Sequence, residues 1–412
     1  NLPPEVYRLK RQLLICGREF MEYALSELFT LQMGKTPSRD NSSYWKKSEN
    51  NWISIADLTN SGKYISNTKE TLSDSAVAES GIKKIPANTV IMSFKLSLGK
   101  VAITEKEMYS NEAIMAFIDK GVEKISPEYL YYLLRAKDWS KGTNKAVMGA
   151  TLNKATLSTI KIQLHEYDNQ LEIVNMLNRV SSSIDFRKQQ LTKLDELIKA
   201  RFVEMFGDLV ENPKQFPCVL LGSIMTVMPQ NGLYKPQSAY VQDKFGTPIL
   251  RIDGFYNGKV TDFNNLKRLC CTDFEKERYL LVENDIVINR VNSIEYLGKC
   301  ARISGLQEDT VFESNMMRFH LDDSKVNSTY ITTVLCSQYI YRQILTRAKK
   351  AVNQASINQG DVQSLNVVVP PLSLQNQFAD FVAEVDKSKV EVQKALDQTQ
   401  LLFDSLMQQY FG

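Results

Sequence analysis

The chain repeats itself at an offset of 205 residues within a length of 412. Residues 145–207 can be laid over residues 350–412 without a gap, so that Ala150-Thr151-Leu152-Asn153 meets Ala355-Ser356-Ile357-Asn358. A solenoid unit runs roughly 20–50 residues, so this longer unit is a duplicated domain followed by a helix. The repeat therefore predicts a molecule that performs one task twice along one ligand.

The earlier part of each repeat aligns only with gaps. The matched segments are Trp52-Ile53 and Asp57 with Pro248-Ile249 and Asp253, Asn88-Thr89-Val90-Ile91 with Asn284-Asp285-Ile286-Val287, and Gly99-Lys100 with Gly298-Lys299. Repeats that are alike at their ends and different in their earlier parts are expected of two modules that recognise different targets. Old duplication followed by unequal drift is the alternative explanation.

Composition limits the class of protein. A hydrophobic fraction of 43% supports real cores, and no stretch approaches the roughly 18 uninterrupted apolar residues of a membrane span. No signal peptide is recognisable. The six cysteines are scattered and form no CxxC pair, which argues against a disulfide framework or a zinc ribbon and favours a reducing cytoplasm.

The distribution of charge is more informative than the net charge of +3. Residues 140–165 contain four lysines and no acid, and the matching residues 342–360 contain Arg342, Arg347, Lys349 and Lys350 and no acid. Basic stretches without acids, rich in Asn, Gln, Ser and Thr, are typical of sites for a polyanion. Two solvated loops would give the same composition, but their equivalent positions favour a nucleic-acid surface.

Each repeat ends in a predicted long helix with an a/d heptad seam, which favours pairing with another helix. The seam positions are Ile173, Leu177, Val180, Ile184, Arg187, Leu191, Leu194, Ile198, Arg201 and Met205, and Phe378, Val382, Val385, Lys389, Val392, Leu396, Thr399, Phe403, Leu406 and Tyr410. The two seams most simply pair with each other as an antiparallel coiled coil. Arg187, Arg201, Lys389 and Thr399 interrupt the apolar seam, so they either fix its register or lie at its edge.

The ends of these helices are also marked in the sequence. Asp168 and Ser373 are predicted N-caps, and a glycine follows Phe206 and Phe411 as a left-handed C-cap. The globules before the helices are expected to be α+β domains. Their clearest elements are strands at 89–93 and 285–289 and helices at 127–135 and 328–343.

Catalytic motifs are not evident. The two histidines, His165 and His320, lie in no HExxH or HxE context. Gly34-Lys35-Thr36 is similar to the end of a phosphate loop, but Phe29 occupies the position of its required glycine. The chain is therefore not expected to be an enzyme.

Two variable globules, each followed by a long helix ending in Phe-Gly, resemble the specificity subunit of type I restriction-modification systems. The segment Lys199-Ala200-Arg201-Phe202-Val203-Glu204-Met205-Phe206-Gly207 resembles that family's central spacer helix. Ser26-Glu27-Leu28 to Gly34-Lys35-Thr36-Pro37 resembles the opening of its first recognition domain, and Pro370-Pro371-Leu372 the entry to its last helix. His165-Glu166-Tyr167 replaces that proline motif in the first repeat.

The resemblance implies an α+β fold with a pseudo-twofold internal repeat. It divides the chain into an N-terminal extension (1–20, helical or artificially added), target recognition domain 1 (21–165), a central spacer helix (166–207), target recognition domain 2 (208–369) and a C-terminal spacer helix (370–412). In this family each recognition domain reads one half of a bipartite, asymmetric double-stranded DNA site. The helix pair docks two modification (methyltransferase) subunits, and restriction subunits complete the nuclease.

The same resemblance implies that this chain binds no cofactor. S-adenosylmethionine would belong to the methyltransferase partner, and ATP and Mg to the restriction partner. The expected location is the prokaryotic cytoplasm, without membrane contact. Two alternatives remain: a specificity module of a fused type II-like methyltransferase–nuclease, and a coiled-coil scaffold that binds proteins.

Candidate DNA contacts are polar, basic or aromatic residues near predicted strand ends, because Arg and Lys suit guanine edges and Asn and Gln suit adenine edges. They are Lys35, Thr36, Arg39, Tyr44, Lys46, Lys95 and Lys145 in the first domain, and Tyr234, Lys235, Arg251, Arg290, Asn292, Lys350, Asn353 and Gln354 in the second. For any one of them a solvated surface position is an equal alternative. Trp45 and Trp52 are expected in the core.

Overall fold

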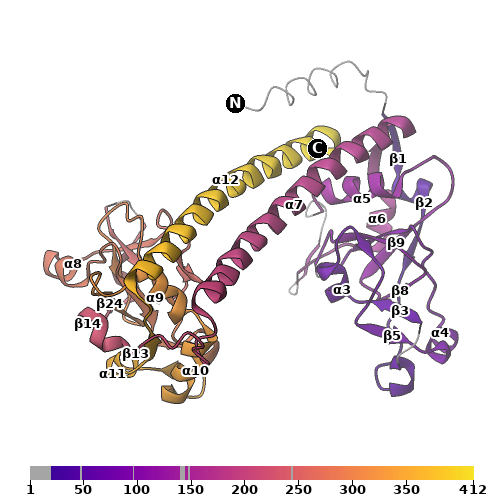
Figure 1. The fold of residues 1–412 in the computed structure, drawn as a ribbon. Helices are drawn as coiled ribbons and strands as arrows, with labels where there is room; N and C mark the ends of the chain where they lie inside the picture. Colours follow the sequence, from indigo (N-terminus) through magenta and orange to yellow (C-terminus); the bar gives the residue numbers. More distant parts are fainter. Residues whose placement is uncertain (1–19, 47–48, 96, 140–143, 147–148, 243–244) are drawn as a thin grey trace. The chain divides into compact units, whose positions relative to one another are not determined.

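The computed structural model describes residues 20–46, 49–95, 97–139, 144–146, 149–242 and 245–412. The chain divides into two compact units. Unit 1 comprises Asn1–Lys188 with Lys394–Gly412, and unit 2 comprises Gln189–Gln393. Each unit contains one globule and a segment of both long helices, α7 (Tyr167–Phe206) and α12 (Leu372–Phe411) (Figure 1). Of the extension expected at residues 1–20, all but Phe20 lies outside the described residues.

The globule of unit 1 is α+β. Its five-stranded sheet has the order β2-β9-β6-β7-β4, beside a three-stranded sheet β5-β3-β8 and the pairs β1-β12 and β10-β11. The elements are β1 (Met21–Ala24), α2 (Leu25–Leu28), β2 (Phe29–Met33), η1 (Ser42–Trp45), β3 (Asn50–Ile53), α3 (Ile55–Asn60), β4 (Tyr64–Ile65), β5 (Glu70–Leu72), α4 (Asp74–Ser80), β6 (Val90–Ser93), β7 (Val101–Thr104), β8 (Tyr109–Ser110), β9 (Ile114–Asp119), α5 (Pro127–Ala136), β10 (Asn144–Ala146), β11 (Gly149–Thr151), α6 (Lys154–Thr159) and β12 (Lys161–Leu164).

The globule of unit 2 has a six-stranded sheet β14-β24-β20-β22-β18-β17, a four-stranded sheet β15-β19-β16-β23, a three-stranded sheet β21-β26-β25 and the pair β13-β27. The elements are β13 (Cys218–Leu220), η2 (Leu221–Ile224), β14 (Met225–Asn231), η3 (Gln237–Ala239), β15 (Tyr240–Val241), β16 (Thr247–Leu250), β17 (Phe255–Tyr256), β18 (Gly258–Val260), β19 (Lys267–Leu269), α8 (Asp273–Tyr279), β20 (Ile286–Asn289), β21 (Val291–Asn292), η4 (Ile294–Tyr296), β22 (Cys300–Arg302), β23 (Val311–Phe312), β24 (Met316–Leu321), α9 (Ser328–Leu335), α10 (Gln338–Arg347), β25 (Lys349–Lys350), β26 (Ala355–Ser356), α11 (Gln359–Gln363) and β27 (Asn366–Val368).

The two globules repeat one strand order. In each main sheet the central strand, β6 or β20, is fully buried and antiparallel to both neighbours. Asn88 and Asn284 precede these strands with positive φ of 57° and 68°, which asparagine tolerates. The parallel ladders β3-β8 and β16-β23 pair Ile53 with Ser110 and Leu250 with Phe312. Trp52-Ile53 therefore corresponds to Ile249-Leu250, one residue later than the sequence alignment predicted.

Three boundary predictions were wrong. The helix expected at 328–343 is two helices, because the Ser337 side chain accepts a hydrogen bond from the Ile340 N–H and caps a new start at α10. The long helices begin at Tyr167 and Leu372, so Asp168 and Ser373 lie in the first turn and are not N-caps. The preceding carbonyls of Glu166 and Pro371 already accept helical bonds from residues four positions later. At the other end of α7 the C-cap prediction is confirmed, with Gly207 at φ 79°.

Two buried glutamines join the starts of the long helices to the globules. Gln170 accepts a hydrogen bond from the Ser126 N–H at 3.0 Å and donates to the His165 carbonyl at 2.9 Å. In unit 2, Gln375 accepts from the Asn327 N–H at 2.9 Å and donates to the Pro370 carbonyl at 2.8 Å. Because each amide serves backbone groups on two elements, it fixes how the helix leaves its globule.

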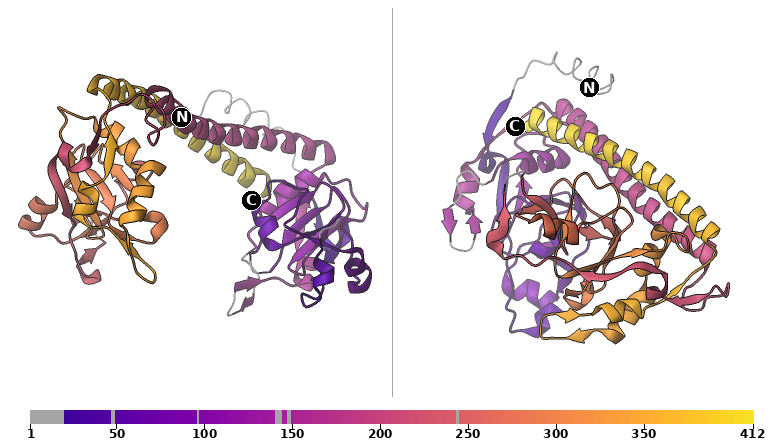
Figure 2. Two further views of the ribbon diagram at one scale, coloured as in Figure 1. Left: turned by 60° about the horizontal axis from the view of Figure 1, so that its bottom comes forward. Right: turned by 90° about the vertical axis from the view of Figure 1, so that its left-hand side faces the viewer.

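The long helices are antiparallel within each unit, as Figure 2 also shows. In unit 1, Leu177 and Ile184 of α7 share a core with Phe403 and Leu406 of α12. In unit 2, Phe202 and Phe206 share a core with Phe378 and Val382, and the rings of Phe202 and Phe378 lie 5.4 Å apart. All predicted seam positions are buried or half-buried. The chain therefore forms an antiparallel coiled coil with a pseudo-twofold internal repeat.

The polar seam residues have partners. Arg187 of α7 donates a hydrogen bond to the Thr399 hydroxyl of α12. Lys389 of α12 forms an ion pair with Asp195 of α7. In an antiparallel helix pair with one register, the residue numbers of facing positions add to a nearly constant sum. That sum is 586 for Arg187 and Thr399, and 584 for Asp195 and Lys389. Both contacts thus belong to one helix register, consistent with register-fixing residues.

Candidate nucleic-acid interface

In each globule, backbone groups from distant parts of the sequence form hydrogen bonds to one short loop. In unit 1 the loop of residues 111–113 joins β8 to β9, and the Phe94 N–H donates to the Ala113 carbonyl at 3.0 Å. In unit 2 the loop of residues 313–315 joins β23 to β24, and the Arg290 N–H donates to the Asn315 carbonyl at 2.9 Å. The same edge of the fold is therefore built twice.

A glycine passes directly over each of these loops. A Cβ on Gly34 would lie 2.2 Å from the Asn111 carbonyl oxygen, and one on Gly232 would lie 2.2 Å from the Glu313 carbonyl oxygen. These clashes are with backbone atoms, so no side-chain rotation relieves them. The close approach brings the two residues after each glycine, Lys35-Thr36 in unit 1 and Leu233-Tyr234 in unit 2, to the loop edge.

The structure brings three predicted contacts of unit 1 to this edge. Lys35 donates its backbone N–H to Ser110 at 2.8 Å, and the Thr36 hydroxyl bonds to Glu112. Arg39 forms a two-pronged ion pair with Glu70, at 2.6 and 3.0 Å, and its guanidinium stacks 3.5 Å over the Trp45 ring. The hydrogen bond from Arg39 lowers the pKa of Glu70. Two of the five N–H donors of Arg39 are thus engaged by Glu70, and the remaining donors could contact a phosphate.

The remaining predicted contacts of unit 1 are more scattered. The Tyr44 hydroxyl donates to Glu79 at 2.5 Å, and Lys46 is exposed. The Lys95 ammonium lies 5.3 Å from the centre of the Phe94 ring. Lys145 lies in β10, but its side chain is outside the described residues. The structure thus unites Lys35, Thr36 and Arg39 but does not bring Tyr44 and Lys46 to the same loop.

The two tryptophans differ in burial. Trp52 is 3% exposed and its ring N–H donates to the Lys35 carbonyl at 3.0 Å. Trp45 is half-buried and meets Trp52 edge to face at 4.9 Å. The prediction that both tryptophans lie in the core is therefore confirmed for Trp52. Trp45 lies at the edge of the core, packed between Trp52 and Arg39.

In unit 2, Tyr234 is 78% exposed, whereas Lys235 is paired with Glu275 at 2.8 Å. The Arg251 Nε lies 3.9 Å from Glu313 and 3.7 Å from Asp253. Burial raises the pKa of Glu313, although the Ile252 N–H and Arg251 oppose the shift. Arg251 is thus engaged by the chain's own acids, as Arg39 is in unit 1.

The other predicted residues of unit 2 lie on the small sheet β21-β26-β25 or beside it. Asn292 of β21 and Lys350 of β25 are the cross-strand neighbours of Ala355 in β26. Asn353 and Gln354 occupy the exposed turn between β25 and β26. Arg290 precedes β21 and donates to the Ser314 carbonyl at 3.2 Å. Five of the eight predicted contacts in this domain therefore converge.

Sequence reasoning missed other exposed residues of this hairpin. Lys349 of β25 is exposed and is a cross-strand neighbour of Ser356, on the opposite face from Ala355, and the half-buried Val291 of the adjoining strand β21 is the other neighbour of Ser356. Val352 is 99% exposed at the turn. Ala355 and Ile357 are buried and Ser356 between them is half-buried, as in a strand with one inner and one outer face. This alternation of apolar and polar residues is the sequence signal that could have identified Ser356 and its neighbour Lys349.

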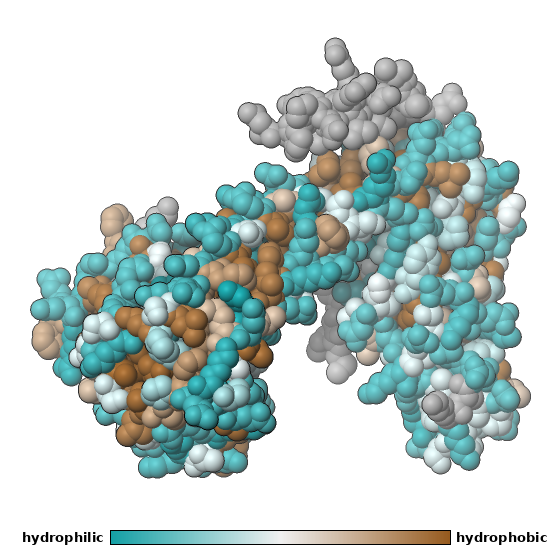
Figure 3. All heavy atoms as spheres, viewed as in Figure 1, coloured by the Kyte–Doolittle hydropathy of each residue, from teal (hydrophilic) through white to brown (hydrophobic). Residues whose placement is uncertain are grey.

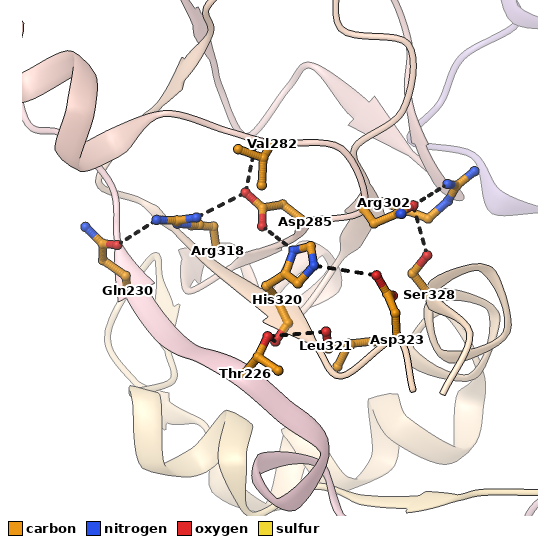
Figure 4. A network of polar contacts seen from close by, with 11 residues as sticks. Thr226, Gln230, Val282, Asp285, Arg302, Arg318, His320, Leu321, Asp323 and Ser328 are labelled. Atoms are coloured by element: carbon orange, nitrogen blue, oxygen red, sulfur yellow. Dashed lines mark hydrogen bonds and ion pairs between the residues drawn. The ribbon is translucent and has the colours of Figure 1, made fainter. Parts of the chain in front are cut away.

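His320 is part of a structural hydrogen-bond network. His320 Nδ1 lies 2.9 Å from the fully buried carboxylate of Asp285, which also pairs with Arg318 at 3.2 Å and accepts the Val282 N–H (Figure 4). The other ring nitrogen faces Asp323 at 3.9 Å rather than a hydroxyl or thiol. This arrangement satisfies a buried charge and presents no nucleophile.

The described residues offer neither a metal site nor a membrane-spanning helix. No group of three or more His, Cys, Asp or Glu side chains there could hold a metal ion. Nor does the described part of the chain contain a helix of the length and hydrophobicity that spanning a membrane requires.

Comparison with known proteins identifies the family. The family model described as type I restriction modification DNA specificity domain matches residues 17–196 and 213–399. The chain therefore belongs to this family, and it has the non-catalytic, DNA-recognising role of a specificity subunit in a type I restriction-modification system.

Curated relatives and solved structures agree. The chain is 23% identical over 396 residues to the type I restriction enzyme MjaIX specificity subunit of Methanocaldococcus jannaschii, covering 91% of this chain and 88% of the relative. It is 24% identical over 285 residues to the EcoKI specificity subunit of Escherichia coli, covering 64% and 60%. The S subunit from M. genitalium shares the fold with a TM-score of 0.55 at 14% identity, covering 94% of this chain and 95% of that one.

Proposed function

We propose that this chain reads a bipartite, asymmetric site in double-stranded DNA, with one globule on each half. The observation that carries the proposal is the repeated edge with different side chains. The exposed Lys35 of unit 1 corresponds to the buried Leu233 of unit 2, and the half-buried Thr36 corresponds to the exposed Tyr234. Next to the same loop, the buried Phe94 corresponds to the half-buried Arg290. One frame that presents different contact groups suits two different half-site sequences.

The helix pair is proposed to set the distance between the half-sites and to dock two methyltransferase subunits. Hydrophobic side chains reach the surface along these helices (Figure 3). Phe186 is 60% exposed and Leu401 68% in unit 1, and Leu197 is 46% exposed and Val390 53% in unit 2. Exposed apolar side chains on a helix favour burial against a partner protein.

In this proposal the chemistry belongs to partner subunits. The methyltransferase subunits would bind S-adenosylmethionine and methylate one base in each half-site. Restriction subunits would supply ATP- and Mg-dependent cleavage, and the assembly would work in the prokaryotic cytoplasm.

Methylome sequencing tests the function directly. Co-expression of the chain with its methyltransferase subunit should produce one asymmetric motif with a gap of fixed length. Exchanging residues 21–165 for the corresponding globule of a relative should change one half of the motif and leave the other half and the gap unchanged.

Cells that express the methyltransferase subunit alone are the control. Unchanged methylation when this chain is removed would contradict the proposal. A gel-shift assay at several salt concentrations separates DNA binding from a purely protein-binding scaffold, because phosphate contacts weaken steeply with salt.

A further inference from the structure

The hairpin of unit 2 formed by β25, the turn at residues 351–354 and β26 has a rigid base. The Ile357 N–H donates to the Arg290 carbonyl at 3.0 Å, and β21 pairs with β26 along its other edge. Ala355 and Ile357 are each 3% exposed and belong to the hydrophobic core of unit 2. The hairpin is therefore held along its β26 edge before any ligand is met, and β25 is the outer strand of the three-stranded sheet.

The turn of this hairpin is tight and fully accessible. The Ala351 N–H donates to the Gln354 carbonyl at 2.7 Å. Val352 is 99% exposed, and Asn353 and Gln354 are exposed beside it. Core packing does not explain an exposed apolar side chain that is followed by two exposed amides in a hydrogen-bonded turn.

The charge of the hairpin matches a polyanion. Lys349 and Lys350 are exposed, and no described residue forms an ion pair with either ammonium group. Residues 342–360 contain no acid. By contrast, Arg347 is held inside the globule, because its guanidinium donates to the Ser364 hydroxyl and carbonyl, each at 3.0 Å. Within the hairpin itself, Lys349 and Lys350 of β25 are thus the bases presented outward.

We propose that this hairpin enters the major groove of the half-site that unit 2 reads and that its turn recognises A·T base pairs. This inference rests on the proposed function and names the element and the base pairs involved. The major groove, about 12 Å wide, admits a two-stranded β-ribbon. Asn353 and Gln354 have the donor and acceptor that match adenine N6 and N7, Val352 packs on the thymine methyl group, and Lys349 and Lys350 contact phosphates.

Alanine variants at the turn test the recognition. In the complex with the methyltransferase subunit, Asn353→Ala and Gln354→Ala should weaken binding to the cognate duplex by about 5- to 150-fold and relax one or two adjacent base pairs of one half-site. Lys349→Ala and Lys350→Ala should weaken all sequences alike and reduce the salt slope by about one unit each. The matched controls Gln307→Ala and Val210→Ala change exposed residues outside the hairpin.

Modified bases test the groove and the contact. Replacing adenine with 7-deazaadenine, which lacks N7, should weaken DNA binding by the wild-type complex several-fold. It should not change binding by whichever of Asn353→Ala and Gln354→Ala has lost the contact with that adenine. Replacing thymine with uracil, which lacks the methyl group, should weaken DNA binding by the wild-type complex but not by the Val352→Ala complex. Matching thermal unfolding of all variants shows that they are folded.

The outcomes separate the two proposals. If wild type confers a bipartite motif while the turn variants keep wild-type affinity, motif and response to modified bases, the hairpin inference is overturned and the proposed function stands. If the wild-type complex shows no sequence preference, both are overturned.

Discussion

Single residues at the recognition edges are constrained by backbone contacts more than by their own chemistry. Gly34 and Gly232 sit where any Cβ would meet a carbonyl oxygen at 2.2 Å. Several basic residues beside them, such as Arg39 and Lys235, are held by carboxylates of the same globule. These pairs orient the side chains, and exposed pairs of this kind add little stability.

Gly232→Ala should lower the free energy of unfolding of unit 2 by about 2–3 kcal/mol, because the added methyl group overlaps fixed backbone. Gly62→Ala is the control, since nothing lies within 4 Å of its Cβ position, and its effect should stay within about 0.5 kcal/mol. Chemical denaturation measures both. Equal stability of the two variants would show that the loop yields easily.

Glu128 provides a pH-dependent contribution in unit 1. Burial alone would raise its pKa, but hydrogen bonds from Lys63, Tyr64 and Asn178 outweigh burial and lower it. The folded pKa thus lies below the unfolded value, so the stabilisation is present above the unfolded pKa and is lost as the pH falls through the folded pKa. Asn178 lies on α7, so this cluster also joins the globule to the long helix.

Glu128→Gln should lower the thermal unfolding midpoint of the chain at pH 7, and the difference from wild type should shrink as the pH falls below the ordinary glutamate pKa of 4.5. Glu107→Gln, which removes only the exposed pair with Lys84, is the control and should change little. A difference that stays constant from pH 7 to pH 3 would contradict an electrostatic origin.

At the scale of elements, the long helices are fixed by a few polar contacts within an apolar seam. Gln170 and Gln375 set where each helix leaves its globule, and Arg187–Thr399 and Lys389–Asp195 set the register. The pseudo-twofold equivalents of Arg187 and Thr399 are Val392 and Leu194, at the 205-residue offset. The polar contact therefore occurs once and breaks the symmetry of the repeat.

Gln375→Leu should destabilise unit 2 by about 2–4 kcal/mol, because it leaves the buried Asn327 N–H and Pro370 carbonyl without their partner. Gln377→Leu, at an exposed position one half-turn away, is the matched control. Hydrogen exchange of the first turn of α12 should rise only in Gln375→Leu. Unchanged protection there would mean that seam packing alone holds the helix start.

At the scale of the whole molecule, the two helices link the two globules, and we propose that they set the distance between the two half-sites. Inserting one heptad after Gln190 and one after Leu396 preserves the seam at matched levels of the antiparallel pair. Seven residues add about 10 Å of helix, equal to about three base pairs of duplex. Methylome sequencing should show both half-sites unchanged and a gap longer by about three base pairs.

A four-residue insertion at the same two places is the control, because it shifts the heptad phase and should reduce modification of every sequence. If the heptad variant retains the original gap, the helices do not set the spacing.

The sequence by itself determined the repeat, the two seams and the class of protein. Heptad spacing, the Phe-Gly ends and buried strands such as β6 and β20 are local patterns that survive without knowledge of tertiary contacts. Only the tertiary structure decided which candidate residues meet at the loop edges and which are held by acids such as Glu70 and Glu275. Glu70 is separated from Arg39 by 31 residues in the chain, and such pairings arise from strand order. Nothing in the local pattern around either residue encodes that order.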